Sequence, residues 1–539
     1  MQQRITINLN TDSKTAGKPT ILEYCRSHGV TGIEAPCGGK GTCGKCKVTV
    51  IKPYYKEVLA CQTKICDGME IIVGGGTITG VGTDMNEAKV SASDEMVVLV
   101  DRKSDMQENP VSVYGNHSSN AGTLAACDIG TTTVVCYLID KETGQIIAVR
   151  SGANPQRSFG ADVLSRIDAA ARADDNDKAN GGLQMMQSQI VSLLNGFISD
   201  MLTECGRTKV CLFSVAGNTV MCHLLMGISP EKLGRAPFMP DEYFGREFNP
   251  LDIGLENCQT MIIFPAVSGF VGGDITAGMM ETVNCRKLTL YLDIGTNGEM
   301  ALGKGDRYVC CATAAGPAFE GAQIEMGMPA SKGAVDKVWL EGRRIKYSVI
   351  GNDRPVGLCG SGLIDALAIL LKAGIIDENG TILSGQELPI LFRSYVFELE
   401  AEDAAQSSES SLAVHIAPGV YITQEDIRKL QLAKGAIAAG IDILFKEYGC
   451  KPCDLDILTF AGGFGNYIDK ASAAAIGLFP PELLDRAKEV GNAAGNGAVS
   501  AALSQEAWES ALDISGKMRY IELASYPHFD EMYVEHMNF

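Results

Sequence analysis

Four cysteines near the start of the chain are the residues best suited to chemistry. Their spacing is Cys37-x5-Cys43-x2-Cys46-x14-Cys61. Three thiolates within one short glycine-rich loop could hold one face of an iron–sulfur cluster, and a fourth thiolate from a separate segment could close the other iron. Glycines in such a loop permit positive φ and expose backbone N–H groups to the sulfides. The pattern therefore predicts a 2Fe–2S cluster bound by these four thiolates.

A zinc site is the alternative, because four thiolates also bind zinc. A usual zinc ribbon pairs two short C-x2-C hooks, and only one half of this set has that form. The three-plus-one arrangement closely resembles the 2Fe–2S ferredoxins, which favours iron. Cys66 competes with Cys61 as the fourth ligand, and Cys25 is expected in the hydrophobic core. The Cys450-x-x-Cys453 spacing resembles a redox pair, but it lacks a βαβ redox context, which favours two ordinary thiols and leaves a redox role open.

A short motif that occurs twice is the second chemical signal. Residues 125–133 read AACDIGTTT, and residues 290–298 read LYLDIGTNG. Each copy follows an apolar strand and precedes an alternating one, so each predicts a strand–turn–strand hairpin. The glycine lets the backbone approach phosphate oxygens, while Thr hydroxyls and turn N–H groups donate to them. The aspartate at the strand end could position Mg²⁺ through water ligands.

Two such hairpins indicate two related α/β halves that face each other. With the glycine-rich turn at 461–466, they resemble the actin/Hsp70/hexokinase superfamily. The resemblance implies bound ATP and Mg²⁺, with catalytic carboxylates at Asp128, Asp274 and Asp293. Asp274 follows two glycines where the superfamily has its first connecting helix, so it would orient Mg²⁺ or the attacking water. The residues implied in nucleotide binding are Gly130, Thr131, Thr132, Gly295, Thr296 and Asn297 at the phosphates, and Gly462 and Gly463 at the adenosine.

The elements that must hold these motifs follow from the apolar pattern. From Leu124 onward, apolar runs that end in glycine-rich turns alternate with amphipathic helices. Helices are expected over 182–205 and from Thr423, where Thr423-x-x-Asp426 predicts an N-cap. The glycine-rich segments 360–362 and 491–497 are left open between nucleotide contact and close packing. Further strands are expected at 210–215, 260–264, 288–292 and 455–460.

The chain of 539 residues is too long for one core and is expected to be a multidomain α/β protein. The predicted parts are a β-grasp 2Fe–2S ferredoxin-like domain at 1–82, and a polar linker at 83–122 with one strand at 96–100. They are followed by two RNase H-like halves of an actin/Hsp70-type ATPase, at 123–286 and at 287–539 with a C-terminal segment.

Composition excludes several classes of partner. A formal charge of −19 argues against nucleic acid, whose phosphates would be repelled. The longest apolar stretch, around 366–376, is interrupted by Lys372 and is too short to span a bilayer. The N-terminus lacks the apolar core of a signal peptide, and 18 cysteines in an unexported chain suggest reduced thiols and metal ligands. A cytoplasmic protein without a membrane partner is expected.

A 2Fe–2S domain in front of such an ATPase resembles the reductive activators of corrinoid-dependent methyltransferases. Segments similar to that family occur along the whole chain, at 154–156, 160–166, 216–221, 315–321 and 520–523. The resemblance implies an ATP-hydrolysing enzyme that passes one electron from its cluster to inactive Co(II) on a partner corrinoid protein. The product would be Co(I), ready for methyl transfer. An upstream low-potential electron donor is also implied, and a homodimer is compatible with the family.

Other classes share parts of this pattern. Activators of radical or dehydratase enzymes also drive an electron with ATP, but usually hold a 4Fe–4S cluster between two subunits on cysteines of the ATPase. A second type of corrinoid activator carries a 4Fe–4S site near its C-terminus, which little beyond Cys453 could supply here. A kinase-like ATPase with an attached electron-transfer domain should show a sugar-binding aspartate, and none is identified.

Overall fold

The computed structural model describes the chain after residue 121 almost completely and the N-terminal domain in short stretches. The described residues are 3–7, 19–27, 30, 33, 35, 38–39, 41, 46–52, 56–66, 68–73, 122–171, 181–282, 286–295, 297–321, 323–399, 412–462 and 468–539. The strand predicted at 96–100 lies outside these residues. So do four predicted site residues, Cys37, Cys43, Thr296 and Gly463.

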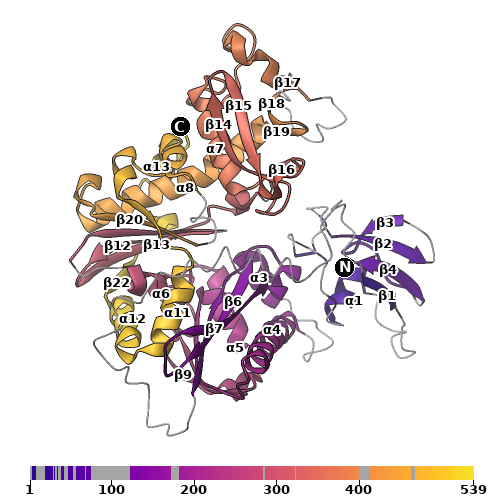
Figure 1. The fold of residues 1–539 in the computed structure, drawn as a ribbon, viewed down its shortest axis with the longest axis vertical. Coiled ribbons are helices and arrows are strands. Elements are labelled where there is room, and N and C mark those ends of the chain that lie inside the picture. The colour runs from indigo at the N-terminus through magenta and orange to yellow at the C-terminus, as the bar shows by residue number, and fades with distance from the viewer. Residues whose placement is uncertain are drawn as a thin grey trace. The chain divides into compact units, whose positions relative to one another are not determined.

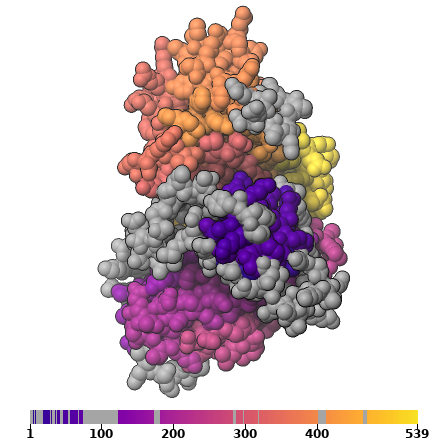
Figure 2. Space-filling view, turned by 90° about the vertical axis from the view of Figure 1, so that its right-hand side faces the viewer, coloured from indigo at the N-terminus to yellow at the C-terminus, as the bar shows by residue number. Residues whose placement is uncertain are grey.

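A four-stranded sheet and one helix form the N-terminal domain. The strand order is β1-β4-β2-β3, and each described pair is antiparallel. In β2 and β4 every second residue is buried, which places Val48, Val50 and Ile71 in one core with Leu22. This β-grasp arrangement confirms the predicted ferredoxin-like domain, whose described residues gather in one indigo region of Figure 2. The bounds are β1 Gln3–Ile7, α1 Ile21–Ser27, β2 Lys47–Lys52, β3 Lys56–Leu59 and β4 Met69–Val73.

Six strands form the sheet of the first α/β half, in the order β7-β6-β5-β8-β10-β9. β5 pairs antiparallel with β6 and parallel with β8, and β8 pairs parallel with β10. The strands are β5 Thr123–Ile129, β6 Thr133–Asp140, β7 Ile146–Ala153, β8 Val210–Gly217, β9 Arg246–Phe248 and β10 Cys258–Ile263. The helices that accompany them are α3 Val163–Ala171, α4 Gly182–Glu204, α5 Thr219–Met226, α6 Gly273–Thr282, α11 Ala493–Leu503 and α12 Gln505–Lys517.

The second half has an equivalent six-stranded sheet, in the order β21-β20-β11-β12-β13-β22. Its strands are β11 Thr289–Ile294, β12 Gly298–Lys304, β13 Arg307–Thr313, β20 Ile457–Ala461, β21 Ala487–Glu489 and β22 Met518–Tyr520. Two small sheets lie between β13 and β20 in the chain: β14 Ala334–Glu341, β15 Arg344–Val349 and β16 Gly357–Leu358, then β17 Val396–Glu398, β18 Leu412–Ala417 and β19 Val420–Thr423. The helices are α7 Gly360–Lys372, α8 Gln424–Tyr448, α10 Lys470–Ala475 and α13 Phe529–Glu535.

The duplication predicted from the repeated motif is visible in the strand order. In each half the first strand (β5 or β11) has the second and third strands of that half on one side. On its other side it pairs in parallel with the fourth strand (β8 or β20), and β10 or β21 follows. The remaining strand, β9 or β22, adds to a different edge in the two sheets. Two halves with one topology confirm the predicted duplicated ATPase fold.

Both faces of the first sheet are covered. Alternate residues of β5 divide between two cores: Cys127 and Ile129 pack with α4 and α5, whereas Leu124 and Ala126 pack with α11 and α12. Trp508 of α12 stacks edge-on against Phe264, with ring centroids 5.4 Å apart. The sheet therefore lies between helices (Figure 1), and packing on both faces of β5 supports its hairpin with β6.

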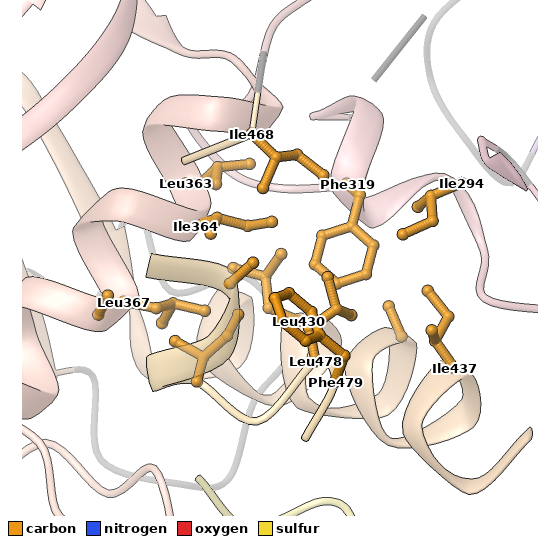
Figure 3. Close-up of a cluster of buried hydrophobic side chains, with 14 of the residues drawn as sticks. Ile294, Phe319, Leu363, Ile364, Leu367, Leu430, Ile437, Ile468, Leu478 and Phe479 are labelled. Atoms are coloured by element: carbon orange, nitrogen blue, oxygen red, sulfur yellow. The ribbon is translucent and has the colours of Figure 1, made fainter. Parts of the chain in front are cut away.

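The core of the second half joins segments far apart in the sequence. Figure 3 shows Ile294 of β11, Leu363 of α7 and Ile437 of α8 around Phe319, and all four side chains are buried. The long helix α8 starts as predicted, because Thr423 and Asp426 form a reciprocal capping box. These contacts anchor β11 and hence the second predicted hairpin.

The compact units of the chain do not follow sequence order. One unit contains residues 1–280 and 494–515, and the other contains 281–493 and 516–539. Thus α11 and α12, expected in the second half, pack on the first sheet, because its apolar face requires cover. The boundaries at 82, 122 and 286 stay predictions. No helix in the described part of the chain is long and apolar enough to cross a membrane.

Candidate iron–sulfur and nucleotide sites

Two of the four predicted cluster ligands are described, and the fold brings them together. Cys46 precedes β2 and Cys61 follows β3, and these strands form one antiparallel hairpin. A hydrogen bond of 2.8 Å from Ala60 N–H to Cys46 C=O closes the end of the hairpin. The Cys46 and Cys61 Sγ atoms lie 3.1 Å apart. Two thiols that are fifteen positions apart in sequence thus converge at one point.

Three described glycines between α1 and β2 have the positive φ that the sequence predicts. Gly38, Gly39 and Gly41 have φ values of 66°, 93° and 80°, which side-chain-bearing residues rarely adopt. Among the described residues no group of three or more metal-binding side chains is found. The converging thiols and left-handed glycines fit a thiolate-bound iron–sulfur group.

The other cysteines near this site behave as predicted or stay undecided. Cys25 is buried in the domain core, and burial raises the pKa of its thiol to about 11, so it is a poor ligand candidate. Cys66 is partly buried beside the same core, and its competition with Cys61 stays open.

In the second half Cys450 is partly buried and Cys453 is exposed, and neither forms a disulfide.

The first predicted phosphate hairpin is held by donors from three other segments. The Asn154 side chain donates to the Gly130 carbonyl at 2.9 Å, and the Asn154 N–H donates to the Thr132 carbonyl at 2.8 Å. Arg166 donates to the Thr131 carbonyl, and Asn218 donates to the Thr131 hydroxyl at 3.0 Å. The turn residues themselves are only partly buried. The turn is therefore fixed from behind while part of it stays accessible.

Two helices begin beside this hairpin. Because β5, β8 and β10 are parallel neighbours, their carboxyl ends meet at one edge of the sheet, where α5 and α6 follow β8 and β10. A Cβ on Gly272 would lie 2.5 Å from the backbone at Asn218 and Thr219, so only glycine permits this approach of α6 to α5. Helix N-termini favour anions. The sheet edge thus offers phosphate-binding groups from three elements.

Asp274, the second residue of α6, has a perturbed acidity. Burial raises the pKa of its carboxyl from 3.8 to about 6, although hydrogen bonds from the Ile275 and Asp274 N–H groups oppose the shift. The Cys222 thiol lies near both Asp274 and Asp128: burial raises the pKa of Cys222, and the two carboxylates raise it further. The fold therefore brings Asp128 and Asp274 to the same sheet edge, and Asp274 is poised to exchange a proton near neutral pH.

The second hairpin has a similar turn in its own half, which is one residue shorter. Gly295 N–H donates to the Asn297 carbonyl at 2.8 Å, whereas Gly130 N–H donates to the Thr133 carbonyl at 2.9 Å. Asp293 lies at the end of β11 and pairs with Ala461 of the parallel strand β20. The next residue, Gly462, has a φ of 80°, and a Cβ there would collide with the Asp293 carboxylate. The structure thus brings together Asp293, Gly295, Asn297 and Gly462.

The later glycine-rich segments have packing reasons of their own. A Cβ on Gly362 would collide with the Val335 carbonyl, and one on Gly497 would collide with the Ala277 carbonyl. Asn154, Arg166 and Asn218 were not among the residues predicted to act at the site. Every residue has a backbone carbonyl, so a sequence does not show which carbonyls need a side-chain donor.

Family models match three consecutive parts of the chain. Residues 7–66 match a 2Fe-2S iron-sulfur cluster binding domain, and residues 124–284 match the RACo middle region. Residues 287–539 match the C-terminal domain of RACo, the ASKHA domain. The chain therefore has a ferredoxin-type cluster domain and an ASKHA nucleotide-binding domain.

Similar proteins cover nearly the whole chain. The corrinoid activation enzyme RamQ of Eubacterium limosum is 32% identical over 95% of each protein. The [Co(II) methylated amine-specific corrinoid protein] reductase of Methanosarcina barkeri is 28% identical over 66% of this chain and 65% of that protein. A solved structure titled reductive activator for corrinoid, iron-sulfur protein is 28% identical, with a TM-score of 0.66 over 99% of this chain and 98% of that one.

Proposed function

The chain belongs to the family of reductive activators of corrinoid proteins, and we propose that it uses ATP to drive one electron onto the Co(II) of a partner corrinoid protein. The electron comes from the 2Fe–2S cluster and yields Co(I), while ATP and water give ADP and phosphate. An upstream low-potential donor would restore the reduced state, and the partner would belong to a methyltransferase system. The observation that carries the proposal is the pairing, in one chain, of converging cysteines with two phosphate-type hairpins.

The energetics explain why ATP is needed. Cys37, Cys43, Cys46 and Cys61 would hold the cluster, which supplies one electron at a potential of roughly −400 mV for a plant-type centre. That potential is not low enough to populate Co(I) comfortably. Each further ~59 mV changes the equilibrium of a one-electron transfer about tenfold. A modest ATP-dependent shift between conformations would therefore change the yield of Co(I) strongly.

The residues of the nucleotide hairpins have separate proposed roles. The turns Gly130–Thr132 and Gly295–Asn297 bind the phosphates, with Asp128 and Asp293 orienting Mg²⁺ through water. Asp274 takes up a proton from the attacking water, a role that its raised pKa supports. Gly462, beside Asp293, and Gly463 contact the adenosine. Because β5 and β11 are each anchored in a core, closure on ATP would move whole halves rather than single loops.

The test measures Co(I) with and without ATP. Reduced full-length protein is mixed with a Co(II) corrinoid partner, and Co(I) is followed by absorbance. We expect little Co(I) without ATP and at least tenfold more with it. Asp293→Ala should keep a reducible cluster and lose the effect of ATP, whereas Cys46→Ser should lose the cluster and still bind ATP.

A matched control is Cys25→Ser, which alters a core cysteine of the same domain and should keep both activities. Equal yields of Co(I) with and without ATP would overturn the proposal. A colourless wild type that contains zinc would overturn the cluster assignment.

A further inference from the structure

Arg166 is an arginine buried inside the first half without a carboxylate in contact. It lies on α3 and is 0% exposed, which makes it one of the largest fully buried side chains in the described part of the chain. Its Nε donates to the Gly160 carbonyl at 3.0 Å, and one terminal nitrogen contacts Met221 Sδ at 3.1 Å. The other terminal nitrogen donates to the Thr131 carbonyl. All three contacts are to uncharged atoms.

Asp162, the acidic residue near Arg166, forms its hydrogen bonds with Ser165 instead. The two Asp162 oxygens accept hydrogen bonds from the Ser165 N–H at 2.7 Å and the Ser165 hydroxyl at 3.0 Å. None of the ion pairs found among the described residues includes Arg166. Burial lowers the pKa of the guanidinium to about 9, the charge of Arg157 lowers it further and the charge of Asp162 opposes the shift, so Arg166 stays protonated at neutral pH. A buried cation without an anionic partner is costly, which calls for an explanation.

The position of Arg166 relative to the hairpin supplies one. Its contact is the carbonyl of Thr131, at the centre of the first phosphate turn, and Asn154 occupies the carbonyls on either side. Met221 Sδ contacts both Arg166 and the Asn154 side chain, so these residues form one cluster behind the turn. Carbonyl oxygens would repel phosphate, and here all three carbonyls of the turn are bound by donors on the protein side.

We propose that Arg166 is a positioning residue for the nucleotide: it turns the Thr131 carbonyl away from the phosphates and supplies the positive charge that the polyphosphate neutralises. This inference rests on the proposed binding of ATP at the first hairpin. The bound polyphosphate balances the positive charge of the buried guanidinium. Arg166 therefore stabilises a bound ligand more strongly the more negative charge the ligand carries. The ligand class is a nucleoside polyphosphate, and adenosine alone gains nothing from Arg166.

The experiment compares ligands that share adenosine and differ in their number of phosphates, and therefore in charge. Dissociation constants for Mg–ATP, Mg–ADP and adenosine are measured by calorimetry on the full-length protein. For Arg166→Gln we expect ATP to bind about tenfold more weakly or worse, ADP to lose less, and adenosine to change less than about twofold. Arg166→Lys keeps the charge and should bind ATP within about threefold of the wild type, although it loses the planar fork.

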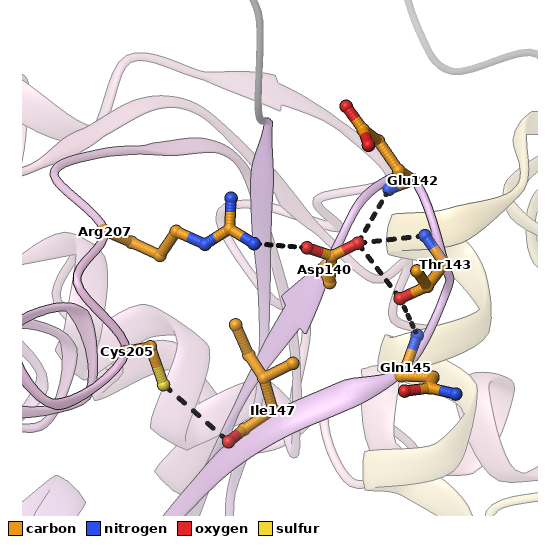
Figure 4. Close-up of polar contacts among 7 residues, drawn as sticks. All are labelled: Asp140, Glu142, Thr143, Gln145, Ile147, Cys205 and Arg207. Carbon is orange, nitrogen blue, oxygen red and sulfur yellow. Dashed lines mark hydrogen bonds and ion pairs between the residues drawn. The ribbon is translucent and has the colours of Figure 1, made fainter.

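Arg207→Gln is the matched control. Arg207 pairs with Asp140 at the opposite end of β6, where Asp140 also accepts from the Glu142 and Thr143 N–H groups (Figure 4). Loss of this ion pair should leave all three dissociation constants unchanged. The control substitution removes an arginine from the same half without touching the phosphate turn.

The outcomes separate the possible roles. Equal losses for ATP and adenosine in Arg166→Gln would show a purely structural role and overturn the inference. If circular dichroism shows that Arg166→Gln does not fold, the test uses Arg166→Lys instead. A folded Arg166→Lys protein that loses the binding of both ATP and adenosine overturns the inference. A wild type that binds no ATP refutes the proposed function itself. ATP binding that is lost in Asp128→Ala but kept in Arg166→Gln refutes this inference alone.

Discussion

At the scale of residues, the carboxyl of Asp274 has a proposed catalytic role and also lowers the free energy of unfolding when it is charged. Asp274 is partly buried, and its carboxyl has a pKa of about 6 rather than 3.8. A group whose pKa is raised in the folded state stabilises the fold fully below its unfolded pKa, and this contribution is lost as pH rises through the folded value. The contribution of Asp274 should therefore disappear between pH ~4 and ~6.

Asp274→Asn tests this trade between activity and stability. The neutral amide carries no cost of burying a charge, so the free energy of unfolding should exceed that of the wild type at pH 8 and match it near pH 4. The pKa difference corresponds to about 3 kcal/mol, and partial exposure reduces the expected gain to about 2 kcal/mol. Urea unfolding at the two pH values measures the gain, and ATP hydrolysis should fall at least a hundredfold. A variant that is less stable at pH 8 would contradict the shifted pKa.

At the scale of elements, the approach of α6 to α5 shapes the edge of the sheet at which we propose that phosphate binds. The backbone at Asn218 and Thr219 leaves no room for a Cβ on Gly272. Gly272→Ala should therefore displace the start of α6, lower the free energy of unfolding by about 2 kcal/mol and weaken ATP binding. Thermal unfolding and calorimetry with Mg–ATP measure the two effects.

Gly196→Ala provides the matched control for that substitution. Gly196 lies within α4, and a Cβ there meets nothing within 4 Å. Alanine in a helix interior is favoured over glycine, so this variant should be more stable by about 1 kcal/mol and bind ATP normally. If both glycine variants behaved alike, the close packing at Gly272 would not limit the site.

At the scale of the whole molecule, the first half is completed by helices that come late in the chain. Leu124, Ala126, Val135 and Tyr137 pack with α11 and α12, which lie in sequence between β21 and β22 of the second half. A fragment that ends at residue 286 would expose this apolar face. We expect the fragment to aggregate, or to bind a hydrophobic dye, whereas the full-length protein does neither. A soluble, cooperatively unfolding fragment would show that α11 and α12 are dispensable.

Features that depend on residue type and local spacing could be predicted before the fold was known. The cysteine pattern predicted a site at which Cys46 and Cys61 converge, and the repeated DIGT motif predicted two hairpins with one topology. The capping box was also predictable, because its partners Thr423 and Asp426 are only three residues apart. Such features need only the chain near them, so their physical reasons are present in short stretches of sequence.

Features that join distant segments could not be predicted, because they depend on how the folded chain packs. Arg166 supports Thr131 from 35 positions away, and its acceptor is a backbone carbonyl, which every residue has. In the same way, α11 and α12 return to the first sheet because an apolar sheet face must be covered, and helices after either half could have met that need. A sequence shows which groups require partners, but the partner is chosen by packing in three dimensions.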